Sequence, residues 1–201
     1  LRNEVTAMSM NITKKLAQKN NDAFHASPIT IGFLGDSVTN GCFEVYPAMT
    51  DEGERGFDVV FEPENSYACH VRKILSLLYP KAQINMINAG ISGDSAPNGL
   101  ARMERDLLPF RPDLTVVCYG LNDSSIGYWD SAEEYVAEYM ETVKTIQEKL
   151  PNATIVVSSI LPAKDPAFQK SAKWRDIPQW SAALEAACKE NGILFANCDY
   201  L

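Results

Sequence analysis

Two hydrophobic patterns alternate along this chain. Short apolar runs, typical of strands buried on both faces, are separated by longer stretches in which apolar residues recur every three or four positions, as in amphipathic helices. The predicted strands cover residues 29–35, 83–89, 114–119, 154–160 and 193–197. The predicted helices cover residues 3–19, 64–79, 97–108 and 131–150, and a last helix follows Asp176 and ends at Asn191-Gly192.

This alternation predicts an α/β fold with a single domain over residues 1–201. Strands that alternate with helices form parallel sheets with helices on both faces, so we expect a three-layer α/β/α arrangement around a five-stranded parallel sheet. We expect the sheet order 2-1-3-4-5, because the ends of the first and third strands should flank one crevice. Residues 41–62 show no clear period and carry several acids, which predicts a long solvated loop.

The charge balance limits the partners of the protein. A formal net charge of −8 and a pI near 4.8 argue against nucleic acid and anionic membranes as partners. No apolar run reaches the length of a membrane-spanning helix and no signal peptide is visible, so membrane insertion is not predicted. The five cysteines form no CxxC pair and no metal-ligand spacing, and their odd number favours reduced thiols in a cytoplasmic protein without a metal site.

Polar groups accompany glycines after each of the first three predicted strands. Ser37 follows the first strand, Gly93 the second and Asn122 the third. The carboxyl ends of parallel strands share one edge of the sheet, so these residues are expected to converge. A serine hydroxyl can attack an ester carbonyl, while backbone N–H groups and an amide stabilise the charge that develops on its oxygen. Ester hydrolysis is therefore a candidate activity, and a small-molecule ester is the expected partner.

The segments that carry these groups resemble a known family. Gly35-Asp36-Ser37, residues 88–94 and residues 120–123 are similar in order and spacing to the first three sequence blocks of the SGNH hydrolases, also called the GDSL esterase/lipase family. The resemblance implies a flavodoxin-like sheet and hydrolysis of O-acyl esters through an acyl-enzyme, with neither a metal nor a cofactor. It also implies that Ser37 is the nucleophile. The backbone N–H groups of Ser37 and Gly93 and the Asn122 amide would then form the oxyanion hole.

One part of the family pattern is absent from residues 1–201. The family takes its base from an Asp-x-x-His block after the fifth strand, whereas the histidines of this sequence are His25 and His70. His25 precedes the first strand, and His70 lies along the apolar stripe of helix 64–79, where a packed or boundary residue is the usual interpretation. We therefore expect that neither histidine contacts Ser37 and that a segment with the Asp-His pair follows Leu201.

Loop aromatics at the reactive edge are candidates for substrate binding. Tyr128, Trp129, Phe168 and Trp174 could line an acyl or sugar pocket, or could cover the core. An acidic chain without a long apolar lid favours small acyl groups, such as acetyl on a carbohydrate.

Two alternatives remain open at this point. One is a flavodoxin-like protein that holds a phosphate ligand at Ser37 and Thr39, and the other is a non-catalytic carbohydrate-binding protein. Asp36 and Asp123 are interpreted as acids that bond to the backbone and hold the loops, rather than as catalytic acids.

Overall fold

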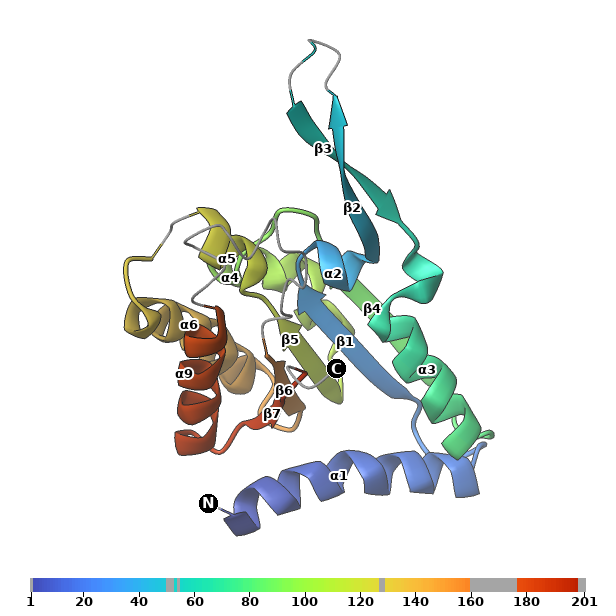
Figure 1. Cartoon of the computed structure of the whole chain (residues 1–201). Helices are drawn as coiled ribbons and strands as arrows, with labels where there is room; N and C mark the ends of the chain where they lie inside the picture. The colour runs from blue at the N-terminus through green and yellow to red at the C-terminus, as the bar shows by residue number, and fades with distance from the viewer. Residues whose placement is uncertain (1, 50–52, 54, 127–128, 160–176, 199–201) are drawn as a thin grey trace.

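A five-stranded parallel sheet lies at the centre of the computed structural model (Figure 1), which describes residues 2–49, 53, 55–126, 129–159 and 177–198. Its order is β4-β1-β5-β6-β7, and all neighbouring pairs are parallel. The strands are β1 (Ile29–Gly35), β4 (Ile84–Gly90), β5 (Leu114–Cys118), β6 (Thr154–Ser158) and β7 (Leu194–Ala196). The predicted order 2-1-3-4-5 is therefore confirmed, with the first predicted strand second from the edge formed by β4.

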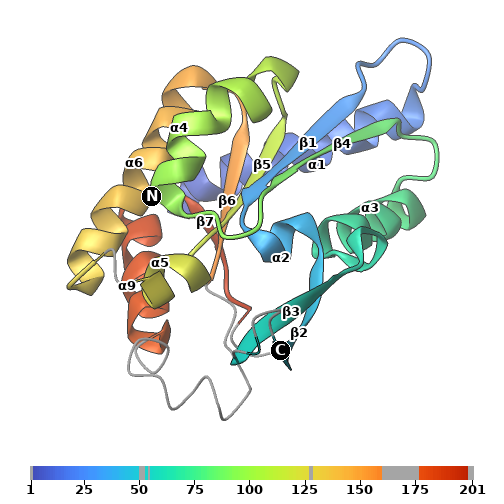
Figure 2. The same cartoon turned by 90° about the horizontal axis from the view of Figure 1, so that it is seen from above.

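Helices cover both faces of the sheet, which confirms the three-layer prediction. Seen from above, α4, α6 and α9 lie on one side and α3 on the other (Figure 2). The long helices are α1 (Arg2–Asn21), α3 (Tyr67–Leu78), α4 (Ala96–Asp106), α6 (Ala132–Lys149) and α9 (Ile177–Glu190). The short ones are α2 (Ser37–Asn40), α5 (Leu121–Ile126), η1 (Pro63–Asn65) and η2 (Leu108–Phe110). No described helix is long and apolar enough to cross a lipid bilayer.

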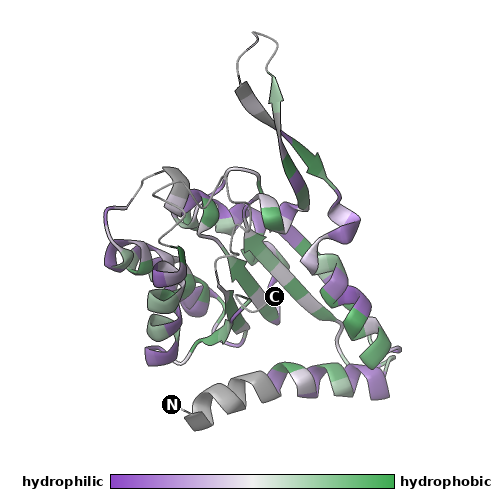
Figure 3. Cartoon of the chain, viewed as in Figure 1, coloured by the Kyte–Doolittle hydropathy of each residue, from purple (hydrophilic) through white to green (hydrophobic). Residues whose placement is uncertain are grey.

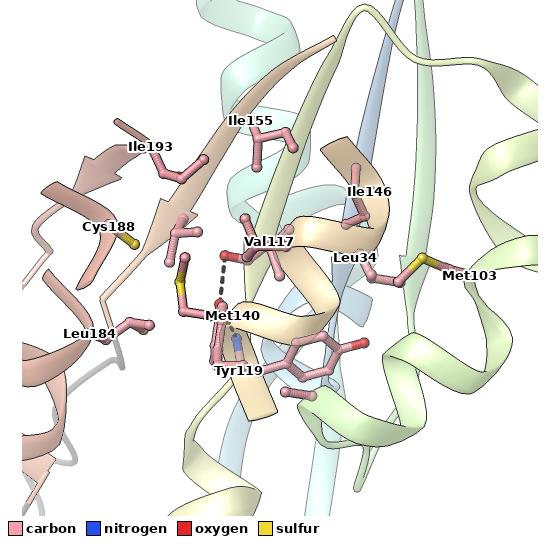
Figure 4. Close-up of a cluster of buried hydrophobic side chains, with 14 of the residues drawn as sticks. Leu34, Met103, Val117, Tyr119, Met140, Ile146, Ile155, Leu184, Cys188 and Ile193 are labelled. Carbon is pink, nitrogen blue, oxygen red and sulfur yellow. Dashed lines mark hydrogen bonds between the residues drawn. The ribbon is translucent and has the colours of Figure 1, made fainter. Parts of the chain in front are cut away.

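Alternation along β1 divides the core between the two faces. Ile31 and Phe33 face α1 and α3, where they belong to the smaller core cluster together with Leu16 and Ala68. Leu34 belongs to the larger cluster, which joins the other face of the sheet to α4, α6 and α9 (Figure 4). Successive strand residues point to opposite faces, so a continuous apolar run is what a strand covered on both sides requires.

The larger core cluster contains buried tyrosines that bond to the strand next to them. The Tyr139 hydroxyl on α6 donates to the Val117 carbonyl at 3.0 Å and accepts from the Tyr119 backbone N–H at 3.3 Å (Figure 4). A buried hydroxyl needs such a partner, because an unpaired one loses its bonds to water without replacement. These bonds hold α6 against the end of β5, the strand that leads to Asn122.

Residues 42–49 and 55–61 form two antiparallel strands, so the prediction of a loop over residues 41–62 is wrong. Strands β2 (Cys42–Met49) and β3 (Arg55–Phe61) pair with each other and project from the body of the protein (Figure 1). Apolar and polar residues are mixed along both strands (Figure 3). Apolar and polar residues do not alternate strictly, because the body of the protein covers neither face of the strands. Among the described strands β2 pairs with β3 alone, and a strand with one neighbour tolerates a proline such as Pro47.

The apolar stripe of α3 is only partly buried. Tyr67, Val71 and Leu75 pack against the smaller core cluster. Ile74 and Leu78, which the sequence pattern placed on the same stripe, are 56% and 64% exposed. The second half of the helix therefore carries apolar side chains on the surface.

Candidate active site

The ends of three neighbouring strands lie at the same level of the sheet. Gly35 at the end of β1 pairs with Gly90 of β4 on one side and with Cys118 of β5 on the other. Ser37, Gly93 and Asn122 follow these ends within a few residues, and α2, α5 and the start of α4 gather at this edge (Figure 1). The register of the sheet therefore brings together three segments that are far apart in the sequence.

Ser37 is the first residue of a four-residue helix that sits directly on the strand ends. The Asp36 carboxylate caps this helix by accepting from the Val38 N–H at 3.0 Å. Gly35 and Gly90 leave the necessary room: a Cβ on Gly35 would lie 2.1 Å from Thr39 Oγ1, and one on Gly90 would lie 2.2 Å from Asn40 N. The two glycines thus allow the closest approach of α2 to the sheet.

The Asn88 side chain fastens α2 to β4 from a position that the sequence reasoning gave no role. Its Nδ2 donates to the Thr39 carbonyl at 2.8 Å, and its Oδ1 accepts from the Gly90 N–H at 2.9 Å. An amide can donate and accept at once, which suits this bridging position. The available signal was an asparagine two residues before the glycine that ends the strand.

Asp94 connects Gly93 to Asn122. The Asn122 Nδ2 donates to the Asp94 carbonyl at 2.9 Å, next to Gly93 in the chain. Gly93 is exposed and has φ of +76°, a left-handed conformation that residues with a Cβ adopt at a cost. The loop after β4 and the start of α5 therefore form one hydrogen-bonded unit.

Asp123 holds the same two loops together, as the sequence interpretation of this acid predicted. Its buried carboxylate accepts from the Ala96 N–H at 3.0 Å and from the Gly120 N–H at 3.1 Å. Burial raises the pKa of this carboxyl, while the two backbone donors act in the opposite direction. Asp36 and Asp123 are thus both bonded to backbone N–H groups.

Arg102 and Asp94 form a buried ion pair beneath this edge, and sequence reasoning missed it. Their side chains are 10% and 5% exposed, and Arg102 Nε donates to Asp94 Oδ2 at 2.9 Å. The signal in the sequence was weak, because an arginine in a helix is ordinarily a surface residue. Only the packing of α4 against the sheet shows that the guanidinium points inward.

In the described part of the chain, neither histidine forms a hydrogen bond with Ser37, in agreement with the expectation. His25 bonds to Asp22 and lines an open cavity with Ile29 and Asp113. These two residues lie at the amino ends of β1 and β5, whereas Ser37 follows the carboxyl end of β1. His70 is exposed on α3, so its interpretation as a packed or boundary residue is wrong. No hydrogen bond joins Ser37 to another side chain among the described residues.

Of the four aromatic candidates, only Trp129 lies within the described residues. It is half-buried and packs against the larger core cluster, which agrees with the interpretation that it covers the core. Tyr128, Phe168 and Trp174 lie outside the described residues. Within the ranges that the structure describes, no group of three or more His, Cys, Asp or Glu side chains is arranged to hold a metal ion.

Asp36 should make the protein less stable as the pH rises from about 4 to about 7. It is 2% exposed, and burial, with the charges of Asp123 and Asp94, raises its pKa from 3.8 to about 7. In that pH range the folded protein retains a proton that the unfolded chain has lost, so raising the pH favours unfolding. Asp36→Asn keeps an acceptor for Val38 and should be more stable than the wild type at pH 8, by at most about 4 kcal/mol.

Denaturant unfolding at several pH values between 4 and 8 measures this difference. Asp130→Asn removes a carboxylate from the surface and is the matched control. Its free energy of unfolding should change with pH in parallel with that of the wild type. If the free energy of unfolding of Asp36→Asn also changes with pH in parallel with the wild type, the pKa of Asp36 is the same in the folded and unfolded protein, which contradicts the prediction.

Comparison with known proteins agrees with this geometry. Residues 33–200 match the GDSL-like Lipase/Acylhydrolase family, which accounts for most of the chain. The chain belongs to this family. Its three strand-end segments are the ones by which the sequence resembled the GDSL esterases.

Several individual proteins are also similar to this GDSL-family chain. An acetylxylan esterase from Geobacillus stearothermophilus is 24% identical over 169 residues, which cover 82% of this chain and 74% of that protein. A solved two-domain esterase active on acetylated mannans has a TM-score of 0.65 at 20% identity and is matched over 94% of this chain, but this chain spans only 41% of its length. A putative GDSL-like lipase from Parabacteroides merdae has a TM-score of 0.65 at 25% identity, covering 84% of this chain and 77% of that one.

Proposed function

We propose that this GDSL-family chain is a serine ester hydrolase that removes small acyl groups, acetyl in particular, from carbohydrates. The observation that carries the proposal is the arrangement of Ser37, Gly93 and Asn122 on three neighbouring strand ends in one register. A nucleophile needs oxyanion donors at a fixed place beside it, and strand ends fix both.

In the proposed reaction, the Ser37 hydroxyl attacks the ester carbonyl carbon and loses its proton to a base. The negative charge then develops on the carbonyl oxygen, where the backbone N–H groups of Ser37 and Gly93 and the Asn122 amide would stabilise it. Collapse of this intermediate breaks the bond to the sugar oxygen, which takes the proton back from the base and leaves as the sugar hydroxyl, and an acetyl group stays on Ser37. Water then attacks that ester while the base accepts its proton, and the serine oxygen regains this proton as acetate is released.

The base in this reaction is not supplied by the described residues. Neither His25 nor His70 forms a hydrogen bond with Ser37 among the described contacts, and an unassisted serine hydroxyl is a poor nucleophile at neutral pH. We propose that the base is a histidine of an Asp-x-x-His segment, as in the family, that residues 1–201 do not contain. Activity measurements therefore use the protein encoded by the complete gene.

The proposed substrate class rests on the related proteins. One relative is an acetylxylan esterase and another acts on acetylated mannans. The family as a whole includes lipases, so the length of the acyl chain is the property to measure.

The five cysteines are free thiols, which supports a reducing compartment, and we propose the cytoplasm.

Acetate release from acetylated xylo- and manno-oligosaccharides tests the substrate class. We expect kcat/KM for 4-nitrophenyl acetate to exceed that for the decanoate ester by about 10²-fold or more, the change that a few kcal/mol of lost fit produces. Deacetylation of the oligosaccharides is followed by mass spectrometry, with the Ser37→Ala variant as the control. A preference for acyl chains of ten or more carbons would contradict the proposal.

A further inference from the structure

The guanidinium of Arg102 contacts all three strand ends that carry the site. Its Nη2 donates to the Gly35 carbonyl at 3.1 Å, at the end of β1, and to the Tyr119 hydroxyl at 3.0 Å, just beyond the end of β5. Both Nε and Nη2 donate to Asp94, in the loop after β4. One side chain thus connects the segments that lead to Ser37, Asn122 and Gly93.

Asp94 receives a third bond that completes the cluster. The Tyr119 hydroxyl donates to Asp94 Oδ2 at 2.8 Å, and Tyr119 is 1% exposed. On the outer side, Arg102 Nη1 donates to Asp106 at 3.1 Å, which holds the guanidinium against its own helix. A buried ion pair with several additional hydrogen bonds is rigid, because each group has no alternative partner in water.

The backbone of Asp94 connects this cluster to the site. Its carboxylate is fixed by Arg102 and Tyr119, while its carbonyl accepts from Asn122 Nδ2 at 2.9 Å. Gly93, with its left-handed backbone, immediately precedes it. The position of Asp94 therefore sets the acceptor of the Asn122 amide and one end of the loop that carries Gly93.

We infer that Arg102 is a positioning residue for the oxyanion hole: it fixes Asp94 so that the Gly93 N–H and the Asn122 amide are directed at one point. Arg102 acts through Asp94 and does not contact the substrate. The inference deepens the proposed function and rests on it, since the oxyanion hole has a role only if Ser37 attacks an ester.

The shape of arginine and the room on α4 both fit this role. A guanidinium offers five donors in a planar fork, whereas a lysine ammonium offers three from one nitrogen and cannot reach the same set of acceptors. Gly99, one turn before Arg102, lies against the tyrosine: a Cβ there would be 2.3 Å from the Tyr119 hydroxyl. Glycine lowers helix stability, so its place inside α4 is explained by this approach.

Two conservative substitutions test the inference in the protein encoded by the complete gene. Arg102→Lys and Tyr119→Phe should each lower kcat for 4-nitrophenyl acetate, by up to about 10²-fold for Arg102→Lys, because small displacements of catalytic groups have effects of this size. KM should change little, since the displaced donors act on the transition state. Arg105→Lys is the matched control on the same helix: Arg105 is 73% exposed and pairs with Asp106. A loss of kcat in the control equal to that of Arg102→Lys would overturn the inference.

The Asn122 side-chain amide provides a readout that does not depend on catalysis. Its ¹H–¹⁵N resonances should shift, and its protons should exchange faster with solvent, in Arg102→Lys and Tyr119→Phe but not in Arg105→Lys. If these resonances are unchanged in both variants, Arg102 does not position Asn122 and the inference is wrong, whatever the activity. If they change as expected while the wild type hydrolyses no ester, the inference about Asn122 holds and the proposed function fails.

A paired variant separates positioning from a contribution to stability alone. Arg102→Met should be strongly destabilised, because it leaves the Asp94 carboxylate buried without its partner. Adding Asp94→Asn removes that charge, so the double variant should regain much of the lost thermal stability. Its kcat should stay at least about 10-fold below the wild type, because the fork that fixes residue 94 is still missing. Recovery of kcat together with stability would show a structural role only.

Discussion

Ser37→Ala is expected to lower kcat for acetate release by about 10⁵- to 10⁶-fold, the size of effect seen when a serine nucleophile is removed. The substitution removes one oxygen atom from a half-buried position at the start of α2 and leaves the Asp36 cap intact. The loss should therefore appear in kcat, while KM and the melting temperature stay close to those of the wild type. Without the hydroxyl there is no acyl-enzyme, and only the donors around it remain to assist attack by water.

Steady-state kinetics with 4-nitrophenyl acetate and thermal unfolding measure the two sides of this expectation. Ser76→Ala, which alters an exposed serine on α3, is the matched control and should be indistinguishable from the wild type. A residual rate of one tenth or more in Ser37→Ala would mean that another group is the nucleophile.

Asn122→Ala is expected to lower kcat by about 10²- to 10³-fold, the cost of removing one oxyanion donor. The amide is held by its bond to the Asp94 carbonyl, so its direction is set before the substrate binds. A donor that meets charge only in the transition state contributes to kcat and little to substrate binding. Asn122 is half-buried at the edge of the sheet and outside both core clusters, so the free energy of unfolding should change by about 1 kcal/mol or less.

Asn98→Ala, on the exposed side of α4, is the matched control for this variant. If Asn122→Ala raises KM with kcat unchanged, the amide binds the substrate in its ground state and is not an oxyanion donor. Arg102→Lys should also have a smaller effect on kcat in the Asn122→Ala background than in the wild type, because both changes act on the same amide.

Strands β2 and β3 show where pattern-based prediction fails in this chain. The inner strands of the central sheet were predicted because both of their faces are covered, which favours continuous apolar runs such as that of β1. The body of the protein covers neither face of strands β2 and β3. Five of their large hydrophobic side chains are exposed: Phe43, Val45, Tyr46, Met49 and Phe61. Without burial on one face, nothing imposes an alternating pattern on the sequence.

The sequence by itself determined the α/β class, the strand order and the three strand-end segments. Strands that are covered on both faces have apolar sequences and can be recognised as such. The parallel arrangement brings their carboxyl ends to one edge of the sheet, so the sequence alone predicts that Ser37, Gly93 and Asn122 lie together. The interpretation of Asp36 and Asp123 as acids that bond to the backbone was also correct. These features follow from local pattern and from the general rules of sheet topology.

Only the tertiary structure decided which polar side chains support the site. Arg102 lies eight residues from Asp94 and 17 from Tyr119, and no sequence spacing indicates that a helix turns this one arginine inward. Whether an arginine is buried depends on how α4 packs against the ends of β1 and β5, which is a property of the assembled layers. His70 illustrates the reverse case, because its place on an apolar stripe suggested packing, yet the body of the protein does not reach that side of α3.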